Sequence, residues 1–546
     1  MIYKSFFEIK NVVSKKLLDF EINGDVSINF SNIENVDLQI NSIVRHKKNE
    51  RFNELSKEIE KGLTELDIVE KCEVASQGFI NIVLSSSFFS KYFSNKKVDL
   101  IASIKHEKRN LLLDYGGANI GKALHVGHIR TLNIGRSLAN IYKLAGNTVM
   151  SDIHFGDWGM PVGLIIAYTE KNNIKLETLN PGDLEIIYPE ASELSKQDEN
   201  FYLDAQHISK KLNEQNTDYL KKWKLVYDVS TNNIKDLLSK LNFVFDIYKG
   251  ESDVISLIPD FVKELKEKKL IILDQEAFIA NNNSEPASII IKSDGAYVYL
   301  TTDLATVIDR EANYEIDEYI YIVDQRQKSH FEQLFRLVED FSLSKKQFTH
   351  VGFGTINDLH GKPLKTRDGG NYKLEDLYSD IREALIEKNN EAKNLEVLSQ
   401  SVLTYSDLVT SRLSDYKFDL DKFTNINGKS AIYIQYSQVR AKKLLNSFNG
   451  AAKLQEIKED EKLLVMDIIK FNYYFDLTIR NNEPHHLAEY LYGLCQKFNT
   501  FYKTNKIFSD KNSDSEISHL IYIVESFYNT LLIVFECLGI DPVESM

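Results

Sequence analysis

The alternation of apolar and polar positions changes character twice along the 546 residues. Short apolar runs such as GFINIVL, residues 78–84, and a charged helical stretch over 46–63 occupy the first hundred positions. Strand-like and helical patterns then alternate from about residue 105, and beyond residue 374 the spacing is helical and rich in Tyr and Phe. The pattern therefore predicts a small α+β domain over 1–104, an α/β domain over 105–373 and an all-α bundle over 374–546.

The α/β segment opens with one β-α-β unit. LLLDY, residues 111–115, is typical of a buried strand, and Ile134, Leu138 and Ile141 follow at helical spacing before a stop at Gly146. A second strand is predicted over 148–153. The glycine-rich turn lies at the carboxyl end of the first strand, where open α/β sheets bind ligands.

Three further patterns extend this unit into a Rossmann-like sheet. Strands are predicted over 318–323 and 349–354, with helices beginning near Thr302 and His330. SIIIKSDGAYVYL, residues 288–300, predicts a hairpin with Asp294 and Gly295 in its turn. Residues 162–287, helical up to about 250, are expected to form an insertion that interrupts the sheet domain without ending it.

The composition adds limits on the function. The hydrophobic content of 43% is that of a globular chain, and no apolar run reaches the roughly 18 residues of a membrane helix, so we expect no membrane span and a cytoplasmic location. The net charge of −14 argues against nonspecific coating of nucleic acid but leaves room for a local basic patch. Cys72, Cys495 and Cys537 lie far apart, which predicts neither a zinc site nor a disulfide framework.

The candidate chemistry gathers in DYGGANIGKALHVGH, residues 114–128. A glycine loop that leads into a helix offers free backbone N–H groups to a phosphate. His125 and His128 stand three apart, so they face the same side of one helical turn and can donate hydrogen bonds to oxygens whose charge grows as pyrophosphate leaves. A metal pair would need further ligands, as in HExxH, which are missing here, so no protein metal site is predicted.

HxGH in this setting occurs both in nucleotidyltransferases and in class I aminoacyl-tRNA synthetases. The longer string over 114–149, followed by HFGDWG at 154–159, resembles arginyl-tRNA synthetases, in which Asn-x-x-Lys precedes the HxGH box. DLQIN and EVASQGFINIVL resemble the family's N-terminal domain, which contacts the corner of the tRNA. QYSQVR, PHHLAEYLYGLCQKFNTFY and the closing LGIDPVESM resemble its anticodon-binding bundle, so the resemblance spans essentially the whole chain.

The resemblance implies a ligase that makes arginyl-adenylate and pyrophosphate from L-arginine and ATP, then transfers the arginyl group to the 3′-terminal ribose of tRNA(Arg). It also implies that tRNA is needed for efficient activation. Mg²⁺ is expected to arrive with ATP, without a dedicated protein cage, and the chain is expected to be a monomer. A carboxylate can hold a guanidinium through two charged hydrogen bonds. The positions that match the family's arginine site are Asp114, Asn119, Tyr299, Asp303 and Gln327.

The remaining assignments divide among catalysis, ATP and tRNA. Catalysis is assigned to Lys122, His125, His128, Lys365 and Arg367, and ATP contacts are assigned to Gly121, Leu124, Gly127 and Thr366. tRNA contacts are assigned to Gln39, Tyr433, Arg440 and Lys442. An aromatic ring can stack on a splayed anticodon base, although core packing is the commoner role of any single aromatic residue.

One segment departs from the family pattern. Class I synthetases carry a KMSKS-like loop that neutralises the triphosphate, whereas this chain has GKPLKTRDGG over 361–370, with Pro363 where the first lysine would stand. We hypothesise that Lys122 substitutes for that lysine, supported by Lys365 and Arg367; the alternative is a solvated loop lysine.

Two other functions stay open at this point. A catalytically inactive tRNA-binding paralogue would be expected to lose the two histidines or Asp303, and all three are present. A small nucleotidyltransferase uses HxGH but would not need the flanking N-terminal and helical domains.

Overall fold

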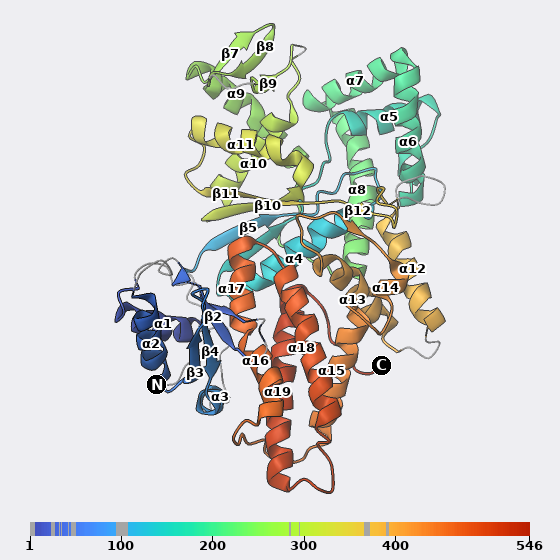
Figure 1. Ribbon diagram of the computed structural model, residues 1–546. Coiled ribbons are helices and arrows are strands. Elements are labelled where there is room, and N and C mark those ends of the chain that lie inside the picture. The colour runs from blue at the N-terminus through green and yellow to red at the C-terminus, as the bar shows by residue number, and fades with distance from the viewer. Residues whose placement is uncertain are drawn as a thin grey trace.

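The computed structural model describes residues 6–22, 28–31, 33, 35–41, 43–44, 51–93, 107–282, 286–293, 295–364, 372–388 and 393–546. Within these ranges the chain forms a central sheet with two lobes on one side and a long helical bundle on the other (Figure 1). The N-terminal domain lies beside the bundle.

The N-terminal domain is the α+β unit that the sequence predicts. Its four strands, β1 (Ile28–Phe30), β2 (Leu38–Ile40), β4 (Ile80–Leu84) and β3 (Val69–Val74), pair antiparallel in that order. Three helices complete it: α1 (Phe6–Leu18), α2 (Phe52–Thr64) and α3 (Ser86–Phe93). The predicted charged helix over 46–63 corresponds to α2, and residues 46–50 lie outside the described ranges.

The central sheet is parallel throughout and has the order β11 (Gln347–Phe353), β10 (Glu318–Asp324), β5 (Asn110–Asp114), β6 (Thr148–Asp152). The helix α4 (His128–Leu144) joins β5 to β6, which confirms the predicted β-α-β unit. The helices α10 (Tyr299–Asn313) and α11 (Lys328–Asp340) cover the opposite face of the sheet from α4 (Figure 1). The Rossmann-like expectation is therefore confirmed.

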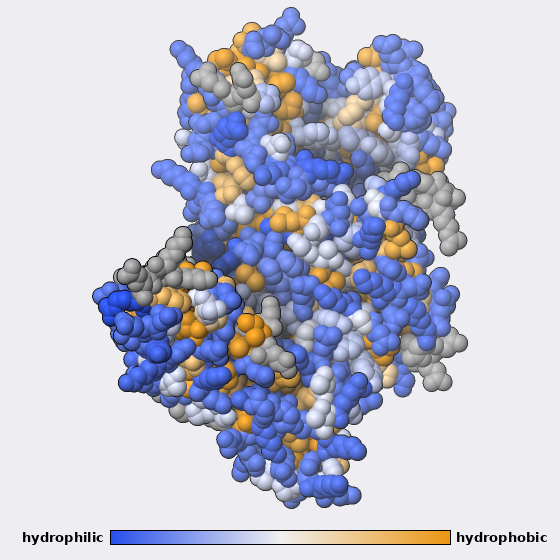
Figure 2. Space-filling view, in the orientation of Figure 1, coloured by the Kyte–Doolittle hydropathy of each residue, from blue (hydrophilic) through white to orange (hydrophobic). Residues whose placement is uncertain are grey.

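The inserted span builds both lobes above the sheet. One lobe holds the helices α5 (Met160–Lys171), α6 (Pro181–Gln197), α7 (Glu199–Asn213) and α8 (Thr217–Lys240), with the short η2 (Leu176–Thr178). The other holds η3 (Glu251–Asp253), η4 (Ile255–Leu257), α9 (Ile258–Glu267) and the antiparallel strands β7 (Ile271–Asp274), β8 (Ala277–Ala280) and β9 (Ile289–Ile291). Figure 2 shows a hollow between the two lobes, above the carboxyl ends of the sheet strands.

The predicted hairpin over 288–300 is wrong in its second arm. Tyr297 makes a single antiparallel bridge to Ile291, and the chain enters α10 at Tyr299; Asp294 lies outside the described residues. Leu300, Leu304 and Val307 are buried at helical spacing, and this pattern prevails over the β-propensity of the Tyr-Val-Tyr run. The candidate residues on this segment therefore stand on the first turns of a helix.

The C-terminal part is a bundle of helices with one exception. Its helices are α12 (Leu374–Lys388), α13 (Leu395–Leu408), α14 (Leu420–Phe423), α15 (Ala431–Asn446), α16 (Glu459–Ile469), α17 (Phe471–Asn481), α18 (His485–Thr504) and α19 (Asp514–Leu538). The strand β13 (Tyr416–Lys417) pairs parallel with β12 (Ile356–Asn357), so the all-α expectation misses a short bridge back to the sheet domain. By length and composition α19 could cross a membrane, but 61% of its most apolar window is buried inside the protein.

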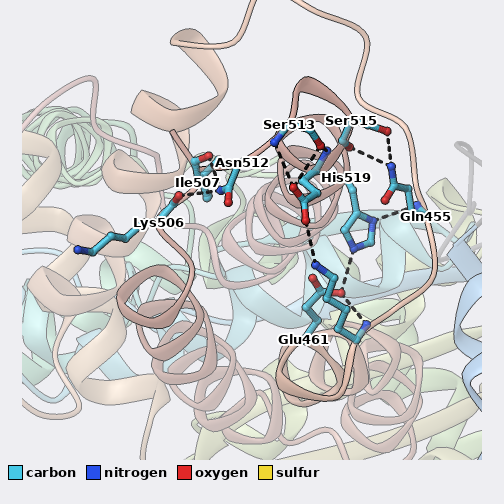
Figure 3. A network of polar contacts seen from close by, with 10 residues as sticks. Gln455, Glu461, Lys506, Ile507, Asn512, Ser513, Ser515 and His519 are labelled. Atoms are coloured by element: carbon cyan, nitrogen blue, oxygen red, sulfur yellow. Dashed lines mark hydrogen bonds and ion pairs between the residues drawn. The ribbon is translucent and has the colours of Figure 1, made fainter. Parts of the chain in front are cut away.

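A polar network holds the start of α19 against α16 (Figure 3). The His519 ring and the Glu461 carboxylate, both buried, are joined by a contact of 2.9 Å between Nε2 and Oε2. The backbone N–H of Gln455 donates to His519 Nδ1 at 3.0 Å. Because Nδ1 accepts, Nε2 carries the ring proton and donates it to Glu461.

The helix that follows the HxGH box is fixed to the bundle. Arg130 is 1% exposed, and its Nε donates to Asp407 Oδ1 of α13 at 2.9 Å. Its Nη1 donates to the carbonyls of Gly354, at 3.0 Å, and Ser414, at 2.8 Å. One buried guanidinium therefore connects α4, α13 and the end of β11.

Candidate active site

The HxGH loop leaves the sheet at the carboxyl end of β5 and enters α4 at His128. At Gly127 a Cβ atom would stand 2.8 Å from His125 Cε1, so a larger residue would displace the ring. At Gly121, which has φ +73°, a Cβ would meet Ile165 at 2.3 Å, and the backbone N–H donates to Ser230 Oγ at 2.9 Å. The loop is thus held in place before any nucleotide arrives. Of the four residues assigned to ATP, Gly121 and Leu124 are buried, Gly127 is half-buried and Thr366 lies outside the described residues.

The backbone contacts both histidine rings at Nδ1. The N–H of Gly127 donates to His125 Nδ1 at 3.0 Å, which leaves the ring proton of neutral His125 on Nε2. His128 Nδ1 lies 3.1 Å from the N–H of His125 and 3.2 Å from its carbonyl oxygen, so it can accept from the first or donate to the second. The centroids of the two rings are 4.0 Å apart.

Electrostatics keeps both histidines neutral at physiological pH. Burial and the neighbouring His125 lower the pKa of His128 to about 3. Burial and then the Lys122 ammonium lower the pKa of His125. Two neutral donors are what a hydrogen-bonding role toward phosphate requires, since neither ring has to exchange a proton.

Of the three cations proposed for the triphosphate, only Lys122 lies within the described residues. Lys122 is exposed, and its Nζ stands 4.6 Å from the centroid of the Tyr188 ring on α6. Lys365, Thr366 and Arg367 lie outside the described residues. Near the loop, His125 forms an isolated antiparallel bridge with Lys373, whose ammonium pairs with Glu185 of the same helix α6 at 2.5 Å. The inserted helix α6 therefore contacts Lys122 of the loop and Lys373, which bridges to His125.

Three of the five predicted arginine residues lie at the start of α10 or just before α11. Asp303 Oδ2 and His330 Nε2 are 2.6 Å apart, and this hydrogen bond raises the pKa of His330 although burial opposes it. Tyr299, one turn before Asp303, is 67% exposed, and Gln327 is exposed in the turn before α11. Tyr299 and Gln327 are therefore open to a ligand, whereas Asp303 is hydrogen-bonded to His330.

Sequence reasoning missed a second carboxylate in this pocket. Burial, Asp303 and Asp157 raise the pKa of Glu251 to about 8, so its side chain lies close to both. Glu251 also raises the pKa of Tyr299, after the larger effect of burial. The one signal in the sequence next to Glu251 is the preceding Gly250. The structure explains this glycine, because a Cβ at position 250 would stand 2.7 Å from the Asp157 carboxylate. Asp157 itself is fully buried and accepts from the backbone N–H and hydroxyl of Ser252.

The strand ends β5 and β6 carry the remaining predicted residues. Asp114 Oδ2 accepts from the buried Arg310 Nη2 at 2.5 Å, and Asp152 accepts from the same nitrogen at 2.6 Å. Asn119 forms an isolated parallel bridge with Gly156. A Cβ at position 156 would lie 2.2 Å from Asn119 Oδ1, so the side chain of Asn119 packs where only glycine leaves room. Within the described part of the chain both ring nitrogens of His154 are buried without a hydrogen-bond partner, a feature the sequence did not flag.

The residues assigned to tRNA fall into two distant places. Gln39 lies on β2, where its Nε2 donates to Asn81 Oδ1 at 3.0 Å. Tyr433, Arg440 and Lys442 lie on α15. Tyr433 is half-buried and packs on the Tyr492 ring at 5.4 Å, and Lys442 pairs with Glu544 at 2.6 Å.

Arg440 lines a cavity of about 280 Å³ at this end of the bundle. Its guanidinium lies between the rings of Tyr436 and Tyr502, 4.4 Å from each centroid. Its Nη1 donates to Asn499 Oδ1 at 2.6 Å. Met546, the last residue of the chain, lines the same cavity.

A parallel sheet with an HxGH loop at its carboxyl edge, lobes inserted above it and a helical bundle behind it define a class I aminoacyl-tRNA synthetase. Family models agree on each part: "tRNA synthetases class I (R), catalytic domain" matches residues 91–420, "DALR anticodon binding domain" matches 434–546, and "Arginyl tRNA synthetase N terminal domain" matches 8–84. The chain belongs to the arginyl-tRNA synthetase family.

Individual proteins support the same family. The arginine–tRNA ligase of Alkaliphilus oremlandii is 34% identical over 526 residues, which cover 89% of each chain. The arginyl-tRNA synthetase of Plasmodium falciparum superposes with a TM-score of 0.81 at 25% identity and covers 99% of this chain and 98% of its own. The Thermus thermophilus arginyl-tRNA synthetase shares the fold, with a TM-score of 0.79 at 18% identity over 98% of this chain and 99% of its own.

Proposed function

We propose that this chain joins L-arginine to tRNA(Arg) in two steps. The arginine carboxylate attacks the α-phosphorus of ATP, which forms arginyl-adenylate as the bond to pyrophosphate breaks. A hydroxyl of the 3′-terminal ribose of tRNA(Arg) then attacks the arginyl carbonyl, which forms the ester and releases AMP. The observation that carries this proposal is a neutral two-histidine phosphate loop in the same domain as the neighbouring acidic side chains of Asp303 and Glu251.

In the activation step the histidines act as hydrogen-bond donors. His125 presents its Nε2–H to the phosphate oxygens. His128 is hydrogen-bonded to the Gly117 carbonyl in the free protein, and it donates to the phosphate oxygens instead when ATP is bound. These oxygens gain negative charge as pyrophosphate leaves, so the donors stabilise the transition state more than the ground state. Mg²⁺ enters with ATP as part of the substrate.

Charge decides which amino acid is accepted. The Asp303 carboxylate and the half-buried Glu251 lie close together, and the exposed Tyr299 is close to Glu251. A guanidinium that enters gives Asp303 a further charged partner and favours the ionised form of Glu251, whereas a neutral side chain of similar length does neither. We assign Asn119 and Gln327 to the arginine backbone. Asp114 acts through Arg310, which it holds at the sheet edge.

The cation that meets the β- and γ-phosphates is Lys122 in this proposal, with Lys365 and Arg367 in support. Lys122 is exposed, and its ammonium lies over the face of the Tyr188 ring. Its ammonium is therefore available to a triphosphate, and the ring contact keeps it near the loop.

tRNA is proposed to contact both ends of the molecule. Gln39 on the N-terminal domain would meet the tRNA corner, and an anticodon base would enter the cavity lined by Arg440 on α15, whose guanidinium already lies between two tyrosine rings. Tyr433 and Lys442 border that helix face. We further propose a monomer in the cytoplasm, with the domain divisions at 104/105 and 373/374.

Pyrophosphate exchange tests the reaction. The chain is incubated with ATP, labelled pyrophosphate and arginine, with and without tRNA(Arg). Label is expected in ATP when arginine is present, and more strongly with tRNA. Lack of exchange under both conditions would refute the enzyme and leave a tRNA-binding protein, whereas exchange without any amino acid would point to a nucleotidyltransferase.

A further inference from the structure

A cluster of three potential metal ligands lies outside the active site, at the turn between α17 and α18. Asn482 ends α17 in the left-handed conformation, with φ 54°, and the chain then continues as Glu483-Pro484-His485-His486 into α18. The oxygen Oε2 of Glu483 lies 3.1 Å from His486 Nε2 and 3.7 Å from His485 Nδ1. All three ligand atoms lie within 4.8 Å of one another.

The two distances from Glu483 are close to those between the ligand atoms of a metal tetrahedron. Zn²⁺ binds imidazole nitrogen and carboxylate oxygen at about 2.0–2.1 Å, which places neighbouring ligand atoms about 3.3 Å apart. The two measured distances bracket that value. The imidazole rings are already side by side, with centroids 4.0 Å apart, so little rearrangement is needed.

A second observation points to a missing ligand. Within the described part of the chain, His485 Nδ1 is buried and has no hydrogen-bond partner. A buried nitrogen without a partner costs free energy unless a proton donor or a cation satisfies it. The three side chains are only 15–21% exposed, so the cluster is not an ordinary group of solvated surface residues.

The charges around the cluster permit a cation. Arg412 is the nearby positive group: its guanidinium donates to the backbone carbonyls of Gly352, Asn481 and Asn482, and Glu483 attracts it electrostatically. Glu489 is also nearby and is paired with Lys429 at 2.9 Å. Asn481 Nδ2 stands 3.5 Å from His486 Nε2, a contact too long to compete strongly with a metal bond.

We infer that Glu483, His485 and His486 form a binding site for a zinc-type divalent cation. The carboxylate oxygen, Nδ1 of His485 and Nε2 of His486 supply three ligands, and the partly exposed side leaves a fourth position for water. The site goes beyond the proposed aminoacylation and does not depend on it. All three ligands lie in the turn between α17 and α18. In the same turn, Asn482 accepts hydrogen bonds from Tyr142 of α4, at 2.6 Å, and from Arg412. A bound cation would therefore stiffen the contact between the bundle and the sheet domain.

Zinc titration of the full chain tests this site. The protein, prepared without a histidine tag and stripped with EDTA, is titrated with Zn²⁺ in an isothermal calorimeter. We expect one zinc per chain with an affinity in the micromolar range or tighter, weakened at least tenfold in His486→Gln and in Glu483→Gln. His207→Gln, which removes an exposed histidine of α7, serves as the matched control and should bind like the original protein. Absence of binding, or equal binding by all variants, would overturn the site.

Cobalt gives a readout that does not depend on the variants folding. Co²⁺ added to the unsubstituted chain is expected to show the visible absorption bands of a nitrogen- and oxygen-bound ion in low coordination, and Zn²⁺ is expected to remove them. A spectrum identical to that of hydrated Co²⁺ would contradict the proposal. Zinc is also expected to raise the thermal unfolding midpoint of the original protein and leave that of His486→Gln unchanged.

Discussion

At the scale of single residues, Lys122 is the sharpest test of the phosphate loop. Its exposed ammonium stands over Tyr188, and the proposal gives it the role of the absent loop lysine. Lys122→Ala is expected to slow arginine-dependent pyrophosphate exchange by about 10²-fold or more, because a charged contact to the leaving group is lost in the transition state. tRNA affinity, measured by filter binding, should change little. Lys175→Ala, an exposed lysine of the inserted lobe, is the control. Unchanged exchange kinetics would show that Lys122 is a solvated loop residue.

The raised pKa of Glu251 predicts that arginine binding releases a proton. Its pKa of about 8 means that the carboxyl is largely protonated at pH 7 in the free protein. An arriving guanidinium favours the ionised form, so arginine binding at pH 7 should release close to one proton, about 0.9 for a group of this pKa. Calorimetric titrations in buffers of different ionisation enthalpy measure this number, and Glu251→Gln should abolish the release. Heats that are the same in every buffer would contradict the assignment.

The same carboxyl affects stability with a definite sign. A carboxyl whose pKa is raised on folding binds more protons in the folded state, so it stabilises the fold below pH 4.5 and this contribution is lost as the pH rises toward 8. Glu251→Gln should therefore be more stable than the original chain at pH 8 by on the order of 1–3 kcal/mol and show little difference at pH 4.5.

The residues of the site were predictable to the extent that they lie in one continuous motif. His125, His128 and Lys122 stand within seven positions and could be read from spacing. Glu251 and His330 could not: Glu251 reaches Asp303 only when the inserted span folds back, and His330 reaches it because α11 packs beside α10. The tautomers of the histidines depend on individual backbone amides, which no sequence pattern specifies.

At the scale of elements, one buried ion pair holds the helix after the HxGH box. Arg130→Met would leave the Asp407 carboxylate buried with only Asn133 as a side-chain partner, and would free the carbonyls of Gly354 and Ser414. Breaking a buried pair from one side typically costs about 3–5 kcal/mol. We expect a loss of this size in the free energy of urea unfolding. Arg382→Met, which removes an exposed arginine of α12, should cost less than about 0.5 kcal/mol. Equal effects would show that the pair contributes nothing to stability.

The periodic elements were predictable and the short ones were not. The strands β5, β6, β10 and β11 and the long helix α4 fall where apolar spacing places them. The second arm of the hairpin after β9 fails because Tyr-Val-Tyr has β-propensity while the residues from Leu300 onward have helical spacing, and burial decides for the helix. The two-residue β12–β13 pair is too short to leave a pattern, and it depends on residues about 60 positions apart.

At the scale of the whole molecule, the division into an N-terminal α+β unit, an interrupted parallel sheet and a helical bundle follows from the hydrophobic pattern. What the pattern could not give is how these parts meet. Arg130 reaches α13 over 277 positions, and Tyr142 of α4 reaches Asn482 over 340. These contacts connect the HxGH helix to the bundle that is proposed to bind the anticodon, so the two ends of the protein share one rigid connection.

The central claim is that this chain charges tRNA(Arg) with arginine through a carboxylate-lined pocket. The most direct measurement is the attachment of labelled arginine to tRNA(Arg) by the original chain and by Asp303→Asn, with Asp309→Asn on the same helix α10 as the control. The account predicts ATP-dependent charging by the original chain and by the control, and a loss of kcat/KM for arginine of at least 10²-fold in Asp303→Asn, because the guanidinium loses a charged partner. Undiminished charging by Asp303→Asn, or no charging by the original chain, would contradict it.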